Sequence, residues 1–230
     1  MSSLDPTGSA AADRPWTLWS VLRRPSRDTL GDYPSNGPVL AELAGEPTPG
    51  VTLRGFYDVS GLRADADVMV WLHGESAEAL QSAQRALRRS RELAPLVPTW
   101  AAMGVHRPAE FSTRHEPAYM RSTEPRDWLT VYPFVRSYDW YLLPPEERRA
   151  MLAEHGREGR TFPHVLSNTV ASFALGDYEW LLALEADDLT DLVDLMRHLR
   201  ATDARRHVRE EIPFFTGRRI SADEVAEVVQ

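Results

Sequence analysis

The pattern of apolar and polar positions alternates between a period of two and a helical period, and these changes mark the elements of the first half of the chain. Alternation predicts strands at 16–22, 51–59, 67–72 and 100–106, and amphipathic spacing predicts helices at 39–43 and 76–91. In chain order the elements are strand, helix, strand, strand, helix, strand. That is the order of a ferredoxin-like β-α-β-β-α-β unit.

The same order recurs in the second half, as a weak internal repeat. Strands are predicted at 128–135, 169–175, 178–185 and 212–215, and helices at 145–155 and 188–200. In each half a short polar turn joins the two central strands, and a helix with an acidic first turn follows. We therefore expect an α+β fold in which two ferredoxin-like halves pack their sheets face to face, as a dimeric α+β barrel in one chain.

Four segments follow from this interpretation. Residues 1–14 are small and polar and predict a flexible N-terminal tail, 15–107 form the first half, and 128–220 form the second half. Between the halves, 108–127 contain three prolines and several charges but no period, which predicts a connecting loop. Connections of this length are usually functional or disordered, and this one contains His115.

Composition excludes several kinds of chemistry. All 26 basic residues counted as Lys+Arg are arginine, so no lysine is available for a Schiff base or a P-loop. Because the chain has no cysteine, any metal must be bound by histidine or carboxylate. The net charge of −8 argues against a nucleic-acid or membrane partner. The chain lacks a secretion signal and a long apolar run, which predicts a cytoplasmic protein.

The strand predicted at 128–135 directs two reactive side chains to one face. Alternation places Tyr132 and Arg136 on the same side, so a phenol and a guanidinium point into the same space. The alternative interpretations are a half-buried tyrosine that only packs as an aromatic and an arginine solvated at the end of the strand.

His155 is predicted to end the helix at 145–155. Prolines and glutamates begin this helix, and Gly156 follows its predicted end. His155 shares a face with Met151 and Leu152, so it lies on an apolar stripe. Such a histidine is more often a satisfied core residue than a ligand, although neutral imidazole is a suitable ligand for iron.

Five motifs resemble those of the coproheme decarboxylases of actinobacteria, within the chlorite dismutase-like superfamily. They read YPFVR at 132–136, EHGREGR at 154–160, GDYEW at 176–180, LMRHLRAT at 195–202 and PFFTGR at 213–218. Several independent motifs in one order make the resemblance specific, and it covers about residues 16–220. It implies the dimeric α+β barrel, a cofactor in the second half and a ring of five subunits.

The resemblance also implies an activity. Members of the family use hydrogen peroxide to decarboxylate two propionates of iron coproporphyrin III (coproheme) to vinyl groups, which gives haem b in the last step of coproporphyrin-dependent haem biosynthesis. Coproheme would be substrate and redox cofactor, and coproporphyrin ferrochelatase a transient partner. A haem peroxidase or haem-degrading oxygenase, or a haem carrier or sensor without turnover, would be alternatives on the same fold.

Roles for individual residues follow from the same resemblance. His155 is the expected axial ligand of the iron, and Tyr132 the residue that is oxidised to a radical and takes hydrogen from a propionate β-carbon. His115 is the expected general base for peroxide, with an exposed loop histidine as the alternative. Three further residues are expected to hold a propionate or line the cofactor: Arg136, Trp140 and Trp180.

Two motif arginines and one departure from the family pattern complete the comparison. Arg197 and Arg218 belong to matching motifs, and each is as compatible with a structural salt bridge as with substrate contact. Chlorite dismutases carry a distal arginine about a dozen residues after the proximal histidine, but here the window 165–169 reads VLSNT. We therefore do not expect chlorite decomposition.

Overall fold

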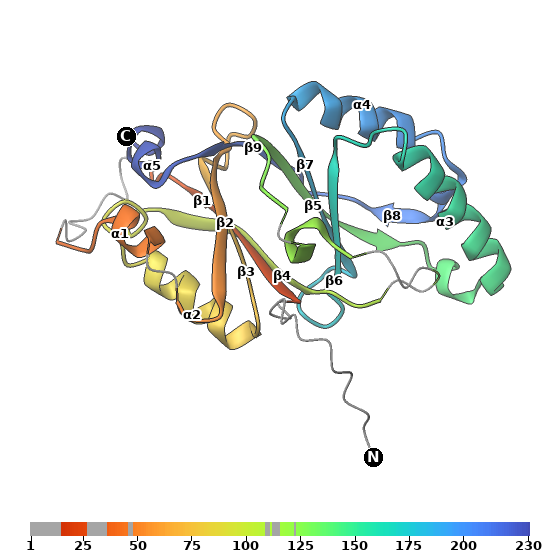
Figure 1. Ribbon diagram of the computed structural model, residues 1–230, viewed down its shortest axis with the longest axis horizontal. Coiled ribbons are helices and arrows are strands. Elements are labelled where there is room, and N and C mark those ends of the chain that lie inside the picture. The colour runs from red at the N-terminus through yellow and green to blue at the C-terminus, as the bar shows by residue number, and fades with distance from the viewer. Residues whose placement is uncertain (1–14, 27–35, 46–47, 109–110, 112–115, 122) are drawn as a thin grey trace, which may run out of the picture.

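The computed structural model describes residues 15–26, 36–45, 48–108, 111, 116–121 and 123–230 (Figure 1). The predicted N-terminal tail and His115 lie outside these residues. The strands are β1 (Trp16–Arg23), β2 (Val51–Asp58), β3 (Val68–Gly74), β4 (Val97–Val105), β5 (Trp128–Arg136), β6 (Leu166–Ala171), β7 (Trp180–Ala186), β8 (Val208–Glu210) and β9 (Phe215–Ile220). The helices are α1 (Leu40–Gly45), α2 (Ala77–Leu87), α3 (Pro145–Gly159), α4 (Leu189–Leu199) and α5 (Ala222–Val228), with short 3₁₀ helices η2 (Ala118–Arg121), η3 (Trp140–Leu142) and η4 (Asp203–His207).

The sheet closes on itself. Neighbouring strands follow the order β7-β6-β4-β1-β3-β2-β9-β5, and β5 also pairs with β7, while β8 extends the far end of β5. The first half contributes β4-β1-β3-β2 and the second contributes β9-β5-β7-β6, which is the same order in both. The predicted fold class, two ferredoxin-like halves in one α+β barrel, is confirmed.

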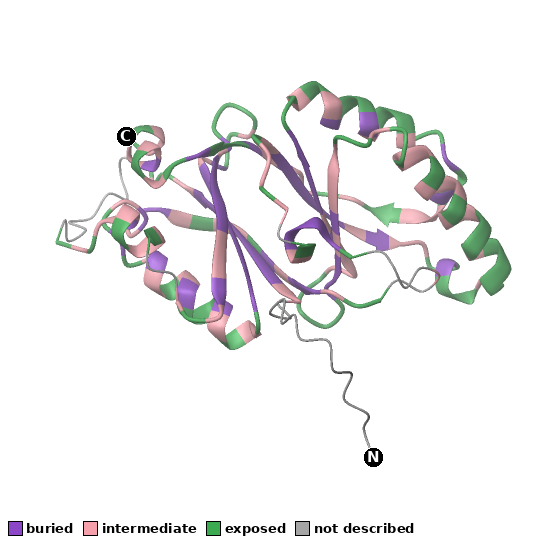
Figure 2. Ribbon diagram, in the orientation of Figure 1, coloured by how far each residue is buried: buried purple, intermediate pink, exposed green. Residues whose placement is uncertain are grey.

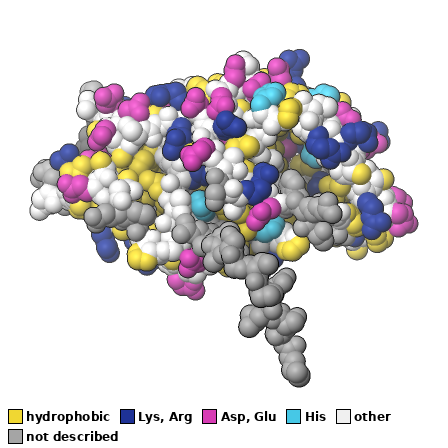
Figure 3. Space-filling view, viewed as in Figure 1, with side chains coloured by type: hydrophobic (Ala, Val, Ile, Leu, Met, Phe, Trp, Pro, Cys, Tyr) yellow, Lys and Arg dark blue, Asp and Glu magenta, His cyan; other side chains and the backbone are white. Residues whose placement is uncertain are grey.

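Apolar side chains fill the interior of the barrel, and others lie between the sheet and the helices that cover its outside. The interior joins the two halves, because Trp19 and Trp71 of the first half share one cluster with Leu129 and Phe215 of the second. Helices α1, α2 and α5 cover the first half, and α4 covers part of the second. Strands are accordingly the most buried elements (Figure 2). On the face shown in Figure 3, acidic and basic side chains are interspersed.

Helix α3 departs from this pattern, because none of its 15 residues is buried. It lies beside α4 at one end of the molecule (Figure 1) and contacts α4 and η4. Met151, Leu152 and His155 are only partly buried, although they form the apolar stripe that the sequence predicted. Apolar helix faces are normally covered, and this face is covered only in part.

Some predicted boundaries are wrong. Helix α3 does not end at His155 but continues to Gly159. A glycine such as Gly156 costs a helix only about 1 kcal/mol, so it need not end the helix. The strand predicted at 212–215 begins instead at Phe215, after Pro213, which lacks the amide hydrogen that a paired strand needs. Elements β8 and α5 were not predicted. The turn of the second hairpin is longer than expected, because β6 begins at Leu166 and ends at Ala171, which leaves 172–179 outside both strands.

The described part of the predicted connection at 108–127 is more ordered than its composition indicated. It contains η2, whose Ala118 and Tyr119 are buried. The backbone amide of Tyr119 donates to Asn168 Oδ1 on β6 at 2.9 Å, and its phenol donates to the carbonyl of Pro15 at 2.8 Å. Contacts of a few buried residues therefore hold the described part of this segment in place, although its sequence has no periodic pattern.

A buried ion pair links the two halves to this connection. Arg54 on β2 donates to Glu185 on β7, with 2.8 Å between Nη2 and Oε1, and the two side chains are 4% and 0% exposed. Asn168 Nδ2 donates to the same carboxylate at 3.0 Å, and Arg54 Nη1 donates to the carbonyl of Thr123 at 3.0 Å. Three strands and the connection therefore depend on one carboxylate.

We expect Glu185→Gln to destabilise the protein strongly. The substitution leaves the Arg54 guanidinium charged and buried without its counter-ion, a change that costs about 3–5 kcal/mol. Asp187→Asn is the matched control, because Asp187 also binds the connection, through Arg126 at 3.0 Å, but its side chain is 62% exposed. Urea unfolding should show a large loss of unfolding free energy for Glu185→Gln and little change for Asp187→Asn. Equal midpoints would contradict the assigned importance of the pair.

Candidate functional site

The hydrogen bonds of His155 determine which ring nitrogen is free. Nδ1 lies 3.3 Å from Thr202 Oγ1, and Thr202 donates its only hydroxyl hydrogen to the carbonyl of Leu199 at 2.9 Å. The hydroxyl can therefore only accept from the imidazole, so Nδ1 carries the hydrogen. The lone pair is left on Nε2, which has no hydrogen-bond partner within the described part of the chain. His155 thus presents a nitrogen that can bind one metal ion.

Electrostatics keep His155 in this neutral form. Burial lowers the pKa of His155 below its ordinary value, and the positive charge of Arg136 lowers it further, while Glu154 acts in the opposite direction. Because only a neutral imidazole can coordinate a metal, the environment favours the form that acts as a ligand.

We expect Thr202→Val to weaken the binding of a metal by His155, although the imidazole itself remains. Valine keeps the shape of threonine but leaves the Nδ1 hydrogen without an acceptor, and losing such a partner typically lowers metal affinity 10- to 100-fold. Thr161→Val is the control, since Thr161 donates to the carbonyl of Glu158 on α3 without touching the imidazole. Titration of both variants with coproheme tests this prediction, and equal affinities would contradict it.

Tyr132 lies on the face of β5 that is turned toward α4. Phe214 stacks on its ring at 4.3 Å between centroids, and its hydroxyl donates to Met196 Sδ at 3.5 Å. Burial raises the pKa of Tyr132 far above its ordinary value of 10, and the nearby carboxylate of Glu211 raises it further. The phenol is therefore protonated, and its only acceptor among the described residues is a weak thioether. Such a phenol can give up a hydrogen atom but cannot act as a phenolate.

Arg136 is a half-buried cation held between aromatic rings. Its guanidinium carbon lies 4.2 Å from the ring centroid of Trp140 and 4.9 Å from that of Phe134. Burial lowers the pKa of Arg136, but arginine remains charged at neutral pH. No carboxylate forms an ion pair with it in the described ranges. The site therefore offers a desolvated guanidinium to an anionic ligand, as a carboxylate would require.

Trp180 belongs to the same aromatic wall. Its ring stacks with Phe134 at 6.2 Å, and its indole Nε1 donates to the hydroxyl of Tyr141 at 3.1 Å. Tyr141 in turn donates to Glu179 Oε2 at 2.9 Å, and burial is the main cause that raises the pKa of Tyr141 to about 12. The same oxygen of Glu179 accepts from the backbone amide of Arg136 at 2.9 Å. These bonds hold the wall in one orientation.

The structure brings four of the six residues singled out in the sequence to one end of the second half. Arg136, Trp140 and Trp180 form one wall. The positive charge of Arg136 lowers the pKa of His155 on α3. Tyr132 shares the strand and face of Arg136 but contacts α4. His115 lies outside the described residues, although Phe111, shortly before it, contacts Arg149 of α3 at 5.1 Å.

Sequence reasoning missed several residues that position this site. Thr202 and Met196 occur within the fourth motif, and Phe214 within the fifth, but no periodicity indicated what they contact. The two motif arginines lie at the surface in ion pairs: Arg197 is 4.0 Å from Asp194, and Arg218 is 3.6 Å from Glu224. Exposed pairs of this kind contribute little to stability, and the choice between a structural salt bridge and substrate contact stays a prediction for both arginines.

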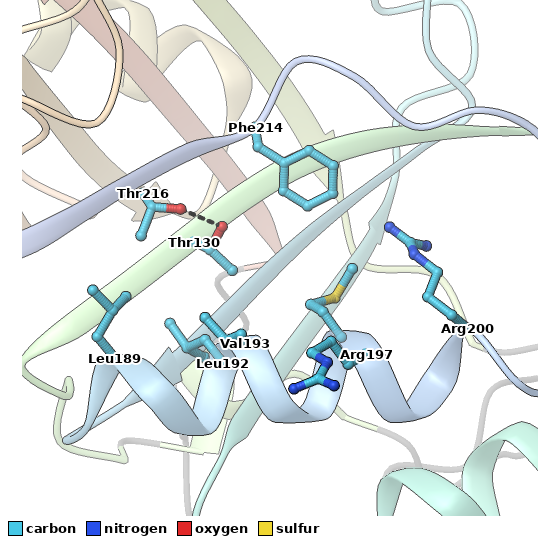
Figure 4. Close-up of a pocket in the computed structure, with 9 residues that line it drawn as sticks. Thr130, Leu189, Leu192, Val193, Arg197, Arg200, Phe214 and Thr216 are labelled. Carbon is cyan, nitrogen blue, oxygen red and sulfur yellow. Dashed lines mark hydrogen bonds between the residues drawn. The ribbon is translucent and has the colours of Figure 1, made fainter.

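A pocket of about 330 Å³ lies between α4 and the strands β5 and β9 (Figure 4). Thr130 and Thr216 hydrogen-bond to each other at 2.8 Å on its strand side. Leu189, Leu192 and Phe214 line it, with Arg197 and Arg200 at the end of α4. Because Met196 and Phe214 both line the pocket and contact Tyr132, they separate it from the phenol.

The chain belongs to the chlorite dismutase family, whose sequence profile matches residues 38–220. A coproheme decarboxylase of Mycolicibacterium smegmatis is 59% identical over 175 residues, which are 76% of each chain. A coproheme decarboxylase of Staphylococcus carnosus is 24% identical over 177 residues, 70% of each chain. Among solved structures, a variant of chlorite dismutase from Candidatus Nitrospira defluvii aligns with a TM-score of 0.79 at 20% identity, over 95% of this chain and 97% of that one.

The helices that the structure describes include none with the length and apolar character needed to cross a bilayer.

Proposed function

We propose that this protein is a coproheme decarboxylase, which converts two propionates of coproheme to vinyl groups with hydrogen peroxide as the oxidant and releases haem b. The 59% identical relative is named coproheme decarboxylase. Three groups described above support the proposal: an imidazole that can bind iron, a half-buried guanidinium for a carboxylate and a phenol that can lose a hydrogen atom.

The observation that carries the proposal is the pair formed by Arg136 and His155. Within the described residues, the half-buried guanidinium of Arg136 has no carboxylate partner and Nε2 of His155 accepts no hydrogen bond, and the two groups are close enough for the charge of one to lower the pKa of the other. A planar iron porphyrin with carboxylate arms fits this combination of groups, because it offers both a metal and anions. His155 would bind the iron, Arg136 a propionate, and Trp140 and Trp180 would line the ring plane.

Tyr132 is the residue that we assign to the oxidation. When bound, coproheme supplies the redox chemistry of its iron with peroxide. The phenol of Tyr132 loses one electron to the oxidised substrate and one proton, and the resulting radical takes a hydrogen atom from the β-carbon of a propionate. That carbon then gives a second electron to the oxidised substrate, releases CO₂ and leaves the vinyl group, so each propionate uses the two oxidising equivalents of one peroxide. Burial supports this role, because a dry phenol stays protonated until it is oxidised.

The role of His115 is proposed from the family resemblance. An imidazole with a pKa near 6.5 can take the first proton of peroxide and return it to the departing oxygen. We expect His115→Phe to retain coproheme but to slow the peroxide step by roughly 10² to 10⁴, the range for a positioned general base. His164→Phe is the control, since His164 is 54% exposed and paired with Asp191. Stopped-flow rates equal to the wild type would return His115 to the exposed-loop interpretation.

Other parts of the proposal also rest on resemblance. We propose a homopentamer in the cytoplasm that meets coproporphyrin ferrochelatase transiently to receive its substrate. Light scattering on the purified protein should then give five times the 26.0 kDa of one chain. A monomer or dimer would contradict this assembly.

Product mass tests the proposed function. Coproheme is bound to the protein without oxygen, peroxide is added in steps, and the porphyrin is followed by mass spectrometry. We expect a three-propionate intermediate after the first peroxide and haem b after the second. Ring opening would indicate a haem-degrading oxygenase, oxidation of an added electron donor with coproheme intact would indicate a peroxidase, and no change would indicate a carrier or sensor.

A further inference from the structure

Met196 combines three properties, and no other described methionine has all three. Its sulfur is the hydrogen-bond acceptor of the Tyr132 hydroxyl, at 3.5 Å. Its side chain is partly buried and lines the pocket between α4 and the strands. With about 330 Å³, this pocket is roughly ten times the ~30 Å³ that one water occupies in the liquid, so a molecule as small as hydrogen peroxide can enter it. An oxidisable sulfur therefore lies between an open pocket and the phenol.

We propose that Met196 is a peroxide-sensitive modification site, and that its oxidation to the sulfoxide slows the reaction at Tyr132. This inference rests on the role of Tyr132 in the proposed function. The oxidant is hydrogen peroxide, which that function uses. The thioether sulfur takes one oxygen atom from peroxide and loses two electrons, the O–O bond breaks, and the other oxygen leaves as water after a proton moves to it.

The consequence for Tyr132 follows from the change of acceptor. A thioether accepts hydrogen bonds weakly, whereas the sulfoxide carries on its sulfur a polar oxygen that accepts them strongly. The phenolic hydrogen is then held toward α4 and away from the substrate. If one hydrogen bond of ordinary strength must break before reaction, the rate falls roughly tenfold. Excess peroxide thus slows the step that consumes peroxide, and methionine sulfoxide reductases reverse the effect.

Two of the other described methionines provide the comparison. Met69 is 0% exposed inside the first half, and Met103 is partly buried and packs on the core cluster of that half. Neither contacts Tyr132 or lines the pocket. Met103→Leu is therefore the matched control for Met196→Leu, since both remove a sulfur from an apolar environment.

The test separates modification from activity. The substrate-free protein is treated with graded peroxide, peroxide is removed, and each methionine-containing peptide is weighed. Coproheme is then added, and decarboxylation is compared with that of the same variant left untreated. We expect Met196 to gain one oxygen before Met69 does, with a roughly tenfold loss of rate that reductase treatment reverses. Treated Met196→Leu should match its own untreated sample, whereas treated Met103→Leu should lose as much as the wild type.

Three results would overturn the inference. Met196 could resist doses that oxidise Met103, the sulfoxide form could be as active as the untreated protein, or Met196→Leu could lose as much rate as the wild type on treatment. Urea unfolding of the treated protein is a further criterion, because a rate loss explained by unfolding also contradicts the hydrogen-bond mechanism. If untreated wild-type protein makes no haem b, the proposed function fails instead, and the peptide masses still decide whether peroxide reaches Met196.

Discussion

Tyr132→Phe should bind coproheme with an ordinary spectrum, react with peroxide and form no haem b. Phenylalanine keeps the ring that stacks on Phe214 at 4.3 Å and the packing under α4, but it removes the hydroxyl that loses a hydrogen atom. Neither the three-propionate intermediate nor haem b should accumulate, and excess peroxide should bleach the porphyrin. Mass spectrometry of the porphyrin after stepwise addition of peroxide measures this directly.

Two other tyrosines near the site provide controls for this prediction. Tyr138 is 77% exposed and accepts from Arg209, so Tyr138→Phe should decarboxylate like the wild type. Tyr141 is bonded to Trp180 and Glu179, and Tyr141→Phe should still make haem b. If Tyr132→Phe made haem b at near wild-type yield, the radical role would pass to Tyr138, Tyr141 or Trp140.

The second large effect is expected for His155→Ala, which removes the proposed iron ligand. The variant should retain coproheme poorly, and the histidine–iron vibration of the ferrous form should disappear from its resonance Raman spectrum. Added imidazole should restore a ligand, because the cavity left by the side chain accepts it. His207→Ala is the control, since His207 lies near Trp140 at 5.4 Å between ring centroids but bonds to Ser137. An unchanged vibration in His155→Ala would contradict the assignment.

The lowered pKa of His155 adds a pH dependence to this prediction. The ordinary value is 6.5, and burial places the folded value below it. Wild-type protein should therefore retain coproheme as the pH falls to about 6.5, and lose it only at lower pH, when the imidazole takes up a proton. A loss centred above 6.5 would contradict the burial of this group.

Alternation predicted the parts of the fold and site that depend on local pattern. It placed Tyr132 and Arg136 on one face of β5, and it predicted the order of elements that builds both halves. The apolar stripe of α3 was also predicted from the pattern, but the pattern did not indicate that the stripe would be covered only in part. Periodicity records which face is apolar, and only the fold shows what covers it.

Other features could not be read from the sequence, because they depend on contacts between distant segments. The bond from His155 to Thr202 and the contacts of Tyr132 with Met196 and Phe214 join separate motifs. Strand β9 was misplaced because the apolar residues before Phe215 resemble a strand, whereas pairing with β2 and β5 determines where the strand begins. The roles of all six candidate residues stay predictions.

A crystal structure of the protein with coproheme bound tests the central claim most directly. That claim is that coproheme lies between α3 and the outer face of the second half. We predict that His155 Nε2 binds the iron, that Arg136 binds a propionate, and that the β-carbon of another propionate faces the hydroxyl of Tyr132. Porphyrin density in the pocket between α4 and β9, or iron bound by a residue other than His155, would contradict the account.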